Sequence, residues 1–369
     1  MSAPAPIPFI DLRPGEDEAA VRTAIDRVLA RGWFVLGPEV DAFEHEFAAA
    51  SGAAFAIGVG NGTDAIALAL RALDIGAGDE VIVPAMTAPY TALAVVAAGA
   101  APVIVDVEPD TLTMNPSACL AAVTTRTRAI VPVHLYGQPA DMEAIRSVAS
   151  RHSLAIVEDC CQAHLATDGG IAVGTRSDAA AFSFYPTKNL GGVGDGGAVI
   201  TGNDAIASRV RQLRNGGQRE RGTHVVTGVN SRLDDLQAAV LRARLPLLPE
   251  WTIRRRALAG RYRQLLPVSV RTIRERDPGH VYHLFPMLAT ERADLQAHLS
   301  LASIDTMVHY PAALTQQPAF AAFASHECPV AVSAAGQLLS LPLSPRLTDE
   351  DIVRVAESVA AFAKGHRLA

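Results

Sequence analysis

Phe182-Ser-Phe-Tyr-Pro-Thr-Lys-Asn-Leu-Gly191 is an apolar, strand-like run that breaks abruptly into a small, polar and glycine-rich loop. This pattern places Lys188 at the end of a predicted strand, close to the hydroxyls of Ser183 and Thr187. Partial desolvation lowers the pKa of such a lysine, so that its neutral amine can form a Schiff base with a carbonyl compound. The alternative for Lys188 is a solvated lysine on a surface turn, and the flanking sequence decides between the two.

A second motif, Leu-Ala-Ile-Val-Glu-Asp at residues 154–159, predicts a buried strand whose carboxyl end delivers Asp159. Strand ends of this kind hold active-site groups in α/β proteins. A pyridine cofactor withdraws electrons only while its ring nitrogen stays protonated, and a fixed carboxylate beside that nitrogen keeps it so. We predict this task for Asp159. The alternative is a helix N-cap or a loop acid, which is the commoner position of an aspartate after a strand.

A third motif, Ala-Ile-Gly-Val-Gly-Asn-Gly-Thr at residues 56–63, passes from a short strand through glycines into an Ala/Leu-rich helix that begins near Thr63. Glycines such as Gly62 let backbone N–H groups approach an anion, and the helix N-terminus and the Thr63 hydroxyl favour it further. The motif therefore predicts a phosphate site, with an ordinary tight turn as the alternative. Its spacing is not Gly-x-Gly-x-x-Gly and no Gly-Lys-Ser/Thr follows, so neither a dinucleotide site nor a P-loop is indicated.

Length and composition narrow the class of protein. The chain has 369 residues, of which 49% are hydrophobic, and it is long enough for two globular domains. A net charge of −6 with scattered arginines predicts no nucleic-acid partner. No basic leader or membrane-length apolar run is seen, so we expect a cytoplasmic protein without membrane contact. Four cysteines lack metal or disulfide spacing, and we expect no metal and assign no catalytic role to Cys119, Cys160, Cys161 and Cys328.

Short apolar runs alternate with Ala-rich helical stretches along the first two thirds of the chain. This α/β pattern predicts a largely parallel sheet, with strands at 81–84, 102–107, 129–133, 154–158, 179–184 and 198–201. Parallel strands end at one edge of a sheet, so the three motifs can converge on one ligand. After an amphipathic helix at 233–247, breaks at Pro246 and Pro249 lead into a region with fewer strand signals. We predict a large domain at 1–247, with an N-terminal arm, and a small C-terminal α/β domain at 248–369.

Six motifs occur in an order that resembles the DegT/DnrJ/EryC1/StrS sugar aminotransferases, and the likeness runs from about Gly37 to the C-terminus. They are Gly-Pro-Glu-Val at 37–40, Val-Gly-Asn-Gly-Thr-Asp-Ala at 59–65, Gly-Asp-Glu-Val-Ile-Val-Pro-Ala at 78–85, His-Leu-Tyr-Gly-Gln-Pro-Ala-Asp-Met at 134–142, Phe-Tyr-Pro-Thr-Lys-Asn-Leu-Gly at 184–191 and Gly-Val-Asn-Ser-Arg-Leu-Asp-Asp-Leu-Gln-Ala-Ala at 228–239. The resemblance implies the type I fold of pyridoxal 5′-phosphate-dependent transferases, that cofactor, and transfer of an amino group to a keto-sugar nucleotide.

The resemblance also implies roles for individual residues. By motif position, Lys188 matches the Schiff-base lysine, Asp159 the partner of the pyridinium nitrogen, and Gln162 a neighbour of the cofactor's ring hydroxyl. The matching phosphate anchors are Gly62, Thr63 and Ser183. Asn230 matches a residue that reaches the phosphate of the opposite subunit, which implies a homodimer with shared active sites and a nearly inactive monomer.

Several other residues are candidates for binding the nucleotide sugar, although each also has a structural alternative. For Asn230 and Arg232 that alternative is capping of the following helix. The candidates are Tyr185, Arg232, His283, His309 and Tyr310.

The chain departs from the family at positions that we expect to face the substrate. Many members have an aromatic residue that stacks on the cofactor ring where this chain has Ala88, and Tyr90 is a candidate substitute. Leu165 stands in place of the usual glycine, and Thr315 stands where relatives often carry histidine.

The resemblance implies L-glutamate as amino donor and, as acceptor, a dTDP-linked 3-keto-6-deoxyhexose aminated at C3 on a route to antibiotic or surface-polysaccharide sugars. C4 amination of a 4-keto nucleotide sugar is the main alternative reaction. Sugar 3-dehydration is disfavoured, because relatives with that activity carry histidine in place of Lys188. The alternative to an enzyme is a regulatory or binding protein that keeps the fold but is catalytically silent.

Overall fold

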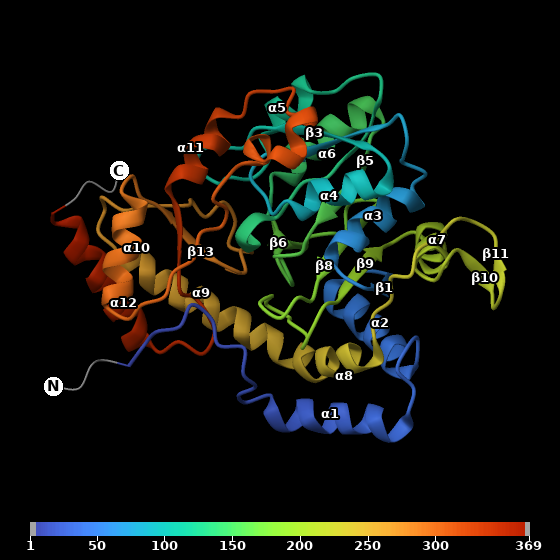
Figure 1. The fold of residues 1–369 in the computed structure, drawn as a ribbon, viewed down its shortest axis with the longest axis horizontal. Coiled ribbons are helices and arrows are strands. Elements are labelled where there is room, and N and C mark those ends of the chain that lie inside the picture. Colours follow the sequence, from blue (N-terminus) through green and yellow to red (C-terminus); the bar gives the residue numbers. More distant parts are fainter. Residues whose placement is uncertain (1–4, 366–369) are drawn as a thin grey trace.

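A seven-stranded mixed sheet forms the centre of the computed structural model, which describes residues 5–365 (Figure 1). Its strand order is β1 (Phe55–Val59), β9 (Gly197–Thr201), β8 (Ala179–Ser183), β5 (Ala155–Asp159), β4 (Thr127–Ile130), β2 (Glu80–Pro84) and β3 (Ala101–Val105). Strand β9 is antiparallel to both of its neighbours, β1 and β8, whereas the other adjacent strands pair in parallel. The predicted α/β class with a mostly parallel sheet is confirmed.

Helices cover both faces of this sheet, and consecutive strand residues point to opposite cores. In β2, Val81 and Val83 pack into one core while Ile82 between them packs into another. The first face carries α3 (Gly62–Ala72), α4 (Tyr90–Ala98) and α7 (Asp204–Arg214). The second carries α2 (Pro38–Ser51), α5 (Pro116–Ala121), α6 (Met142–His152) and α8 (Asp235–Arg244). Burial on both faces explains why the strands read as continuous apolar runs.

The strands predicted at 102–107 and 179–184 end at Val105 and Ser183, and two further predicted elements end early beside prolines. The strand predicted at 129–133 ends at Ile130, close to Pro132, which has no N–H to donate to a ladder. The helix predicted at 233–247 is α8, which passes into the 3-10 turn η2 (Leu245–Leu247) and then into α9 (Leu248–Leu265). Pro246 and Pro249 lie in the first turns of η2 and α9, where a missing N–H costs no helical hydrogen bond.

A second, antiparallel sheet consists of β12 (Arg271–Thr272), β13 (Phe285–Leu288) and β14 (Leu338–Leu341). It packs with α9, α10 (Arg292–Leu301) and α12 (Asp349–Ala363), and Ile7 from the N-terminal arm joins the same core. Helix α9 runs from the large sheet toward this smaller layer (Figure 1). The domain division after residue 247 falls between η2 and α9 and stays a prediction.

The remaining elements are short or peripheral. They are α1 (Glu18–Arg31), η1 (Leu135–Gly137), the pair β6 (Thr167–Asp168) and β7 (Ile171–Ala172), the hairpin β10 (Gln218–Glu220) and β11 (Thr223–His224), η3 (Leu314–Gln316), η4 (Pro318–Phe323) and α11 (Pro329–Gln337). The β10–β11 hairpin projects from one side of the molecule (Figure 1). Within residues 5–365, no helix has both the length and the apolar composition that a bilayer span requires.

Candidate active site

The three motifs predicted from the sequence meet at one edge of the large sheet. Strands β1, β5 and β8 run in the same direction, and their carboxyl ends lead to Gly62, to Asp159 and to the Lys188 loop. The adjacent start of β9 packs tightly against the glycine turn, because a Cβ atom built on Gly197 would lie 2.4 Å from the backbone of Asn61. The predicted convergence of these motifs is therefore observed.

Lys188 lies in the loop between β8 and β9 and is half-buried. Its backbone N–H donates to the Tyr185 carbonyl over 2.8 Å, which closes a turn at the end of the strand. Burial lowers the pKa of the Lys188 ammonium below its ordinary value, although the nearby Cys161 and Asp159 oppose this shift. The neutral amine is therefore easier to form here than on a solvated lysine, as the surrounding sequence predicts.

Asp159 is a buried carboxylate that two neighbours hold in place. The Thr91 hydroxyl donates to its Oδ2 over 2.8 Å, and the Cys161 N–H donates to its Oδ1 over 3.1 Å. The alternative of a helix N-cap is wrong, because Asp159 is the last residue of β5 and no helix begins directly after it. A carboxylate fixed in this way fits the ring nitrogen of a pyridine cofactor.

The start of α3 provides an anion cradle beside these residues. A Cβ atom on Gly62 would lie 2.7 Å from Cys161 Sγ and 2.8 Å from Ser183 Cβ, so only glycine fits. Asn61 caps the helix by accepting the Asp64 N–H over 2.8 Å, which leaves the N–H groups of Gly62 and Thr63 in the first turn. These donors and the adjacent Ser183 hydroxyl fit the phosphate of pyridoxal phosphate.

Gln162 connects two regions that are distant in sequence. Its Oε1 accepts the Tyr136 N–H over 2.6 Å, and its Nε2 donates to the Tyr310 hydroxyl over 2.8 Å. The Tyr136 hydroxyl in turn donates to the His309 carbonyl over 2.5 Å. These bonds tie the segment around residues 309–310 to the end of β5. Tyr136 is a connecting residue to which the sequence analysis gives no role.

The candidate residues for the sugar side have varied surroundings. His309 Nδ1 lies 3.0 Å from Ser340 Oγ, and burial followed by the Lys188 charge lowers the pKa of His309 to about 4, so its imidazole is neutral. His283 Nδ1 lies 3.2 Å from the Asn189 side chain. Tyr185 is 51% exposed and therefore free to contact a ligand.

Asn230 and Arg232 flank Ser231, whose hydroxyl accepts the Gly60 N–H over 2.9 Å beside the glycine turn, and their own contacts are with Asn215. Asn230 is exposed and forms a bridge with Asn215, while the Arg232 guanidinium donates to the Asn215 side chain over 3.1 Å. Asp234 is the N-cap of α8, so helix capping by Asn230 or Arg232 is wrong.

The positions that depart from the family have separate physical explanations. Leu165 has φ of 61°, in the left-handed region that favours glycine, which accounts for the glycine usual at this position. Thr315 is half-buried, and its hydroxyl has no hydrogen-bond partner in the part of the chain that the structure describes. Ala88 is half-buried, whereas Tyr90 is 63% exposed.

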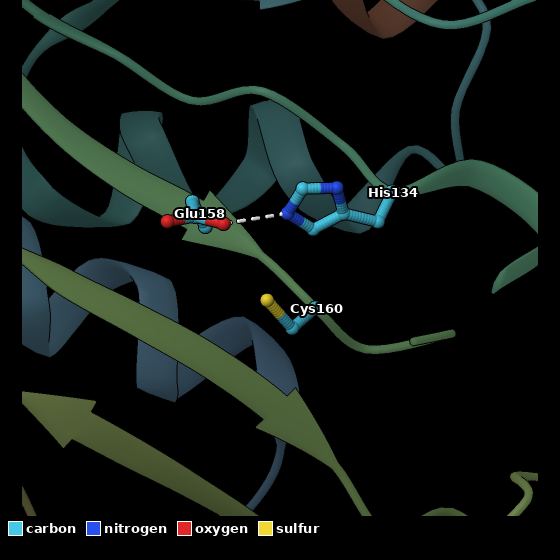
Figure 2. A group of neighbouring side chains, drawn as sticks. All are labelled: His134, Glu158 and Cys160. Carbon is cyan, nitrogen blue, oxygen red and sulfur yellow. Dashed lines mark hydrogen bonds and ion pairs between the residues drawn. The ribbon is translucent and has the colours of Figure 1, made fainter. Parts of the chain in front are cut away.

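His134, Glu158 and Cys160 form a buried group next to Asp159, with potential ligand atoms within 4.8 Å of one another (Figure 2). His134 Nδ1 accepts the Ala140 N–H over 3.0 Å, so its proton is on Nε2, which donates to Glu158 over 2.7 Å. Both imidazole nitrogens are thus used within the protein. His134 and Glu158 are therefore a hydrogen-bonded pair, and their backbone supports the site because the His134 N–H donates to the Asp159 carbonyl over 3.1 Å.

Comparisons with known proteins agree with this geometry. The model of the DegT/DnrJ/EryC1/StrS aminotransferase family matches residues 16–360. A dTDP-3-amino-3,4,6-trideoxy-alpha-D-glucose transaminase from Streptomyces venezuelae is 48% identical over 365 residues, which cover 97% of this chain and 96% of that protein. The crystal structure of S. venezuelae DesV in complex with a ketimine intermediate has a TM-score of 0.94 at 47% identity and covers 97% of this chain and 99% of that one.

The cofactor follows from the family and from a further solved structure. NtdA from Bacillus subtilis with bound cofactor PMP has a TM-score of 0.92 at 33% identity, and the match covers 99% of this chain and 86% of that one. The fixed carboxylate, the desolvated lysine and the anion cradle of this chain fit the same type of cofactor. The chain belongs to the DegT/DnrJ/EryC1/StrS family and is a pyridoxal phosphate-dependent aminotransferase.

Proposed function

We propose that this aminotransferase moves an amino group from L-glutamate to C3 of a dTDP-linked 3-keto-6-deoxyhexose. The observation that carries the proposal is the meeting of Lys188, Asp159 and the Gly62 cradle at one sheet edge. The name of the S. venezuelae relative, a transaminase of a dTDP-3-amino sugar, supports the nucleotide and position 3. An intact lysine with a lowered pKa favours an enzyme over a catalytically silent homologue.

Bound pyridoxal phosphate supplies an electron-withdrawing ring that stabilises negative charge on the reacting carbon. Asp159 holds the proton on the ring nitrogen, because the Thr91 hydroxyl and the Cys161 N–H fix its carboxylate. Lys188 Nζ takes the proton from the α-carbon of the donor and returns a proton in the sugar half of the reaction. A lowered pKa suits this base, since one amine must both accept and release protons near neutral pH.

The phosphate and sugar ends of the site use different groups. We infer that the first-turn N–H groups of Gly62 and Thr63 and the Ser183 hydroxyl bind the cofactor phosphate. The sugar nucleotide then lies against Tyr185, Arg232, His309 and Tyr310. The neutral His309 presents no positive charge there and acts through hydrogen bonding.

We further infer a homodimer in which Asn230 serves the cofactor phosphate of a second copy. Asn230 and its neighbour Val229 are both exposed. Val35 forms a β-bridge with Asp234, four residues after Asn230, and so brings the exposed segment 33–35 near to it. Trp33, Phe34 and Val35 are 56%, 45% and 39% exposed, and a contiguous apolar surface of this kind is typical of an interface.

Two separate half-reactions test the proposal. The cofactor-loaded protein is mixed with L-glutamate, and its visible absorbance is expected to bleach as the amine form of the cofactor accumulates. The aminated protein is then given 3-keto and 4-keto sugars linked to dTDP, UDP or GDP, and mass spectrometry identifies the amino sugar. Amination of only 4-keto sugars would replace the C3 assignment by C4, and absence of bleaching with every amino-acid donor would refute the proposed reaction.

A further inference from the structure

A pocket beside Lys188 is lined by residues of α9 and of the N-terminal arm, and none of its lining residues belongs to the cofactor cradle. Its lining includes Lys188 and Asn189 together with three arginines, Arg244, Arg255 and Arg346. Its cavity volume is about 80 Å³, which is several times the space that one water molecule requires. The pocket therefore has room for a small polar group next to the catalytic amine.

The carboxylates in this pocket already have partners. Asp17 binds Arg244 over 2.7 Å and lies 3.5 Å from Arg346, while Asp11 binds Arg13 over 2.7 Å. Each of these acids is therefore occupied by a cation other than Arg255. Within residues 5–365, no carboxylate forms an ion pair with Arg255.

Arg255 is 4% exposed and is held only by neutral groups. Its Nη1 donates to backbone carbonyls over 3.3, 3.4 and 2.9 Å, those of Tyr282, His283 and Leu343. Its Nε is buried and has no hydrogen-bond partner in the described part of the chain. Burial lowers the pKa of Arg255 to about 10, with no acid to oppose the shift. A buried guanidinium without a counterion is costly, and an anionic ligand removes that cost.

We propose that Arg255 forms an anion subsite that binds a carboxylate of the amino-acid donor in the pocket beside Lys188. A planar guanidinium matches a carboxylate in a way that neutral groups cannot. The small cavity suits a donor, whose carboxylate is only a few bonds from its amine, and a nucleotide diphosphate is much larger. The inference rests on the proposed function, since it assigns the donor of that reaction.

Direct binding of glutarate, a dicarboxylate without an amine, tests the subsite independently of catalysis. Isothermal titration calorimetry on the cofactor-loaded protein is expected to give a Kd that rises roughly tenfold to hundredfold in Arg255→Gln, because a charge-assisted hydrogen bond is lost. Arg254→Gln is the matched control on the same helix, since its guanidinium pairs with Asp349 over 2.8 Å and does not line the pocket. This control is expected to bind glutarate as the wild type does.

A parallel titration with dTDP separates the two sources of an anion. Unchanged dTDP affinity in Arg255→Gln supports the donor carboxylate, whereas weaker dTDP binding with unchanged glutarate binding would assign Arg255 to the diphosphate and overturn the proposal. Equal glutarate affinity in Arg255→Gln and Arg254→Gln would also overturn the proposal, because the role of Arg255 would then be limited to its hydrogen bonds with backbone carbonyls. If circular dichroism shows that Arg255→Gln is unfolded, Arg255→Lys undergoes the same titrations and is expected to bind glutarate more weakly than the wild type. Bleaching by glutamate can still be measured if glutarate does not bind. The proposed subsite can therefore fail while the proposed aminotransferase reaction holds.

Discussion

The hydroxyl of Thr91 lies 2.8 Å from Oδ2 of Asp159, and this contact joins the first turn of α4 to the end of β5. Thr87 extends the chain of hydroxyls, with its Oγ1 at 2.9 Å from Oγ1 of Thr91. The carboxylate has a defined orientation through these side chains and through the Cys161 N–H. The role proposed for Asp159, which is to hold a proton on the cofactor's ring nitrogen, benefits from this preorganisation.

Thr91→Val removes the hydroxyl and keeps the shape of the side chain. A hydrogen bond to a charged group contributes about 1.5–3 kcal/mol, so we expect glutamate-dependent bleaching to slow by roughly tenfold or more. Stopped-flow absorbance measures the rate. Thr111→Val is the control, because it removes another buried hydroxyl, paired with Thr113 over 2.9 Å. An unchanged rate in Thr91→Val would mean that the Cys161 N–H alone orients the carboxylate.

The two lysines of the chain, Lys188 and Lys364, allow an internal comparison. Burial lowers the pKa of Lys188, whereas Lys364 is exposed near the end of the described chain. In the cofactor-free protein, competitive acetylation followed by mass spectrometry is expected to give Lys188 a midpoint below that of an exposed lysine. Lys188→Ala is expected to abolish bleaching by glutamate. A midpoint at or above that of Lys364 would contradict the desolvation of the amine.

Gly62→Ala adds a methyl group that meets Cys161 Sγ and Ser183 Cβ at distances below 3 Å. Since the backbone of the cradle must shift, we expect affinity for pyridoxal phosphate to fall by roughly tenfold or more, as measured by fluorescence titration of the cofactor-free protein. Cys161→Gly in the same protein is expected to restore part of the affinity. The control is Gly260→Ala in α9, where a Cβ atom meets nothing within 4 Å.

The buried pair of His134 and Glu158 predicts a dependence of stability on pH. Burial disfavours the charged Glu158, but the hydrogen bonds that it accepts from His134, Ser177 and Gly174 outweigh burial and lower the pKa of this carboxyl. A lowered folded-state pKa stabilises the fold above the unfolded pKa, and the contribution is lost as the pH falls through the folded value.

Glu158→Gln is therefore expected to cost about 1–3 kcal/mol of unfolding free energy at pH 7 and to weaken the loss of stability in acid. Urea denaturation at pH 7 and below pH 4.5 measures both effects. Glu143→Gln, at an exposed position in α6, is the matched control and should leave both quantities unchanged. An equal loss of unfolding free energy in Glu158→Gln and Glu143→Gln would show that the pair of His134 and Glu158 makes no specific contribution to stability.

Hybrid dimers test the proposed sharing of active sites. Asn230→Ala and Lys188→Ala damage different parts of a shared site, so a hybrid contains one site with both residues intact. We expect a mixture of the two variants, refolded together, to regain activity above that of either variant alone. Activity that never exceeds the mean of the separate variants would contradict a shared site.

Much of the candidate site could be predicted, because its residues come directly after strands and local sequence patterns identify where those strands end. Lys188, Asp159 and Gly62 each stand where an apolar run breaks, and parallel strands bring such breaks together. Gln162 and Tyr310 could not be paired in this way, because 148 positions separate them and their contact depends on tertiary packing. Thr91 was equally hidden, since a threonine inside an Ala-rich helix carries no signal of a carboxylate partner.

Arg255 could not be singled out from the sequence. It is the middle residue of Arg254-Arg255-Arg256, and composition does not distinguish the three. The buried residues of α9 include Thr252, Arg255, Ala259 and Tyr262, which share one helical face. The packing of α9 therefore separates the buried Arg255 from Arg254 and Arg256, which are half-buried.

The antiparallel strand β9 restricts how the active-site loop can change in length. Because β8 and β9 are adjacent, the segment that carries Lys188 leaves and re-enters the sheet within one strand spacing. The loop is also packed on itself, because the Gly192 N–H donates to the Phe184 carbonyl over 2.7 Å and a Cβ atom on Gly191 would lie 2.4 Å from the Pro186 carbonyl oxygen. An inserted or deleted residue there would displace the amine. Length variation among homologous chains should therefore be rare in this segment and should accumulate in the projecting β10–β11 hairpin.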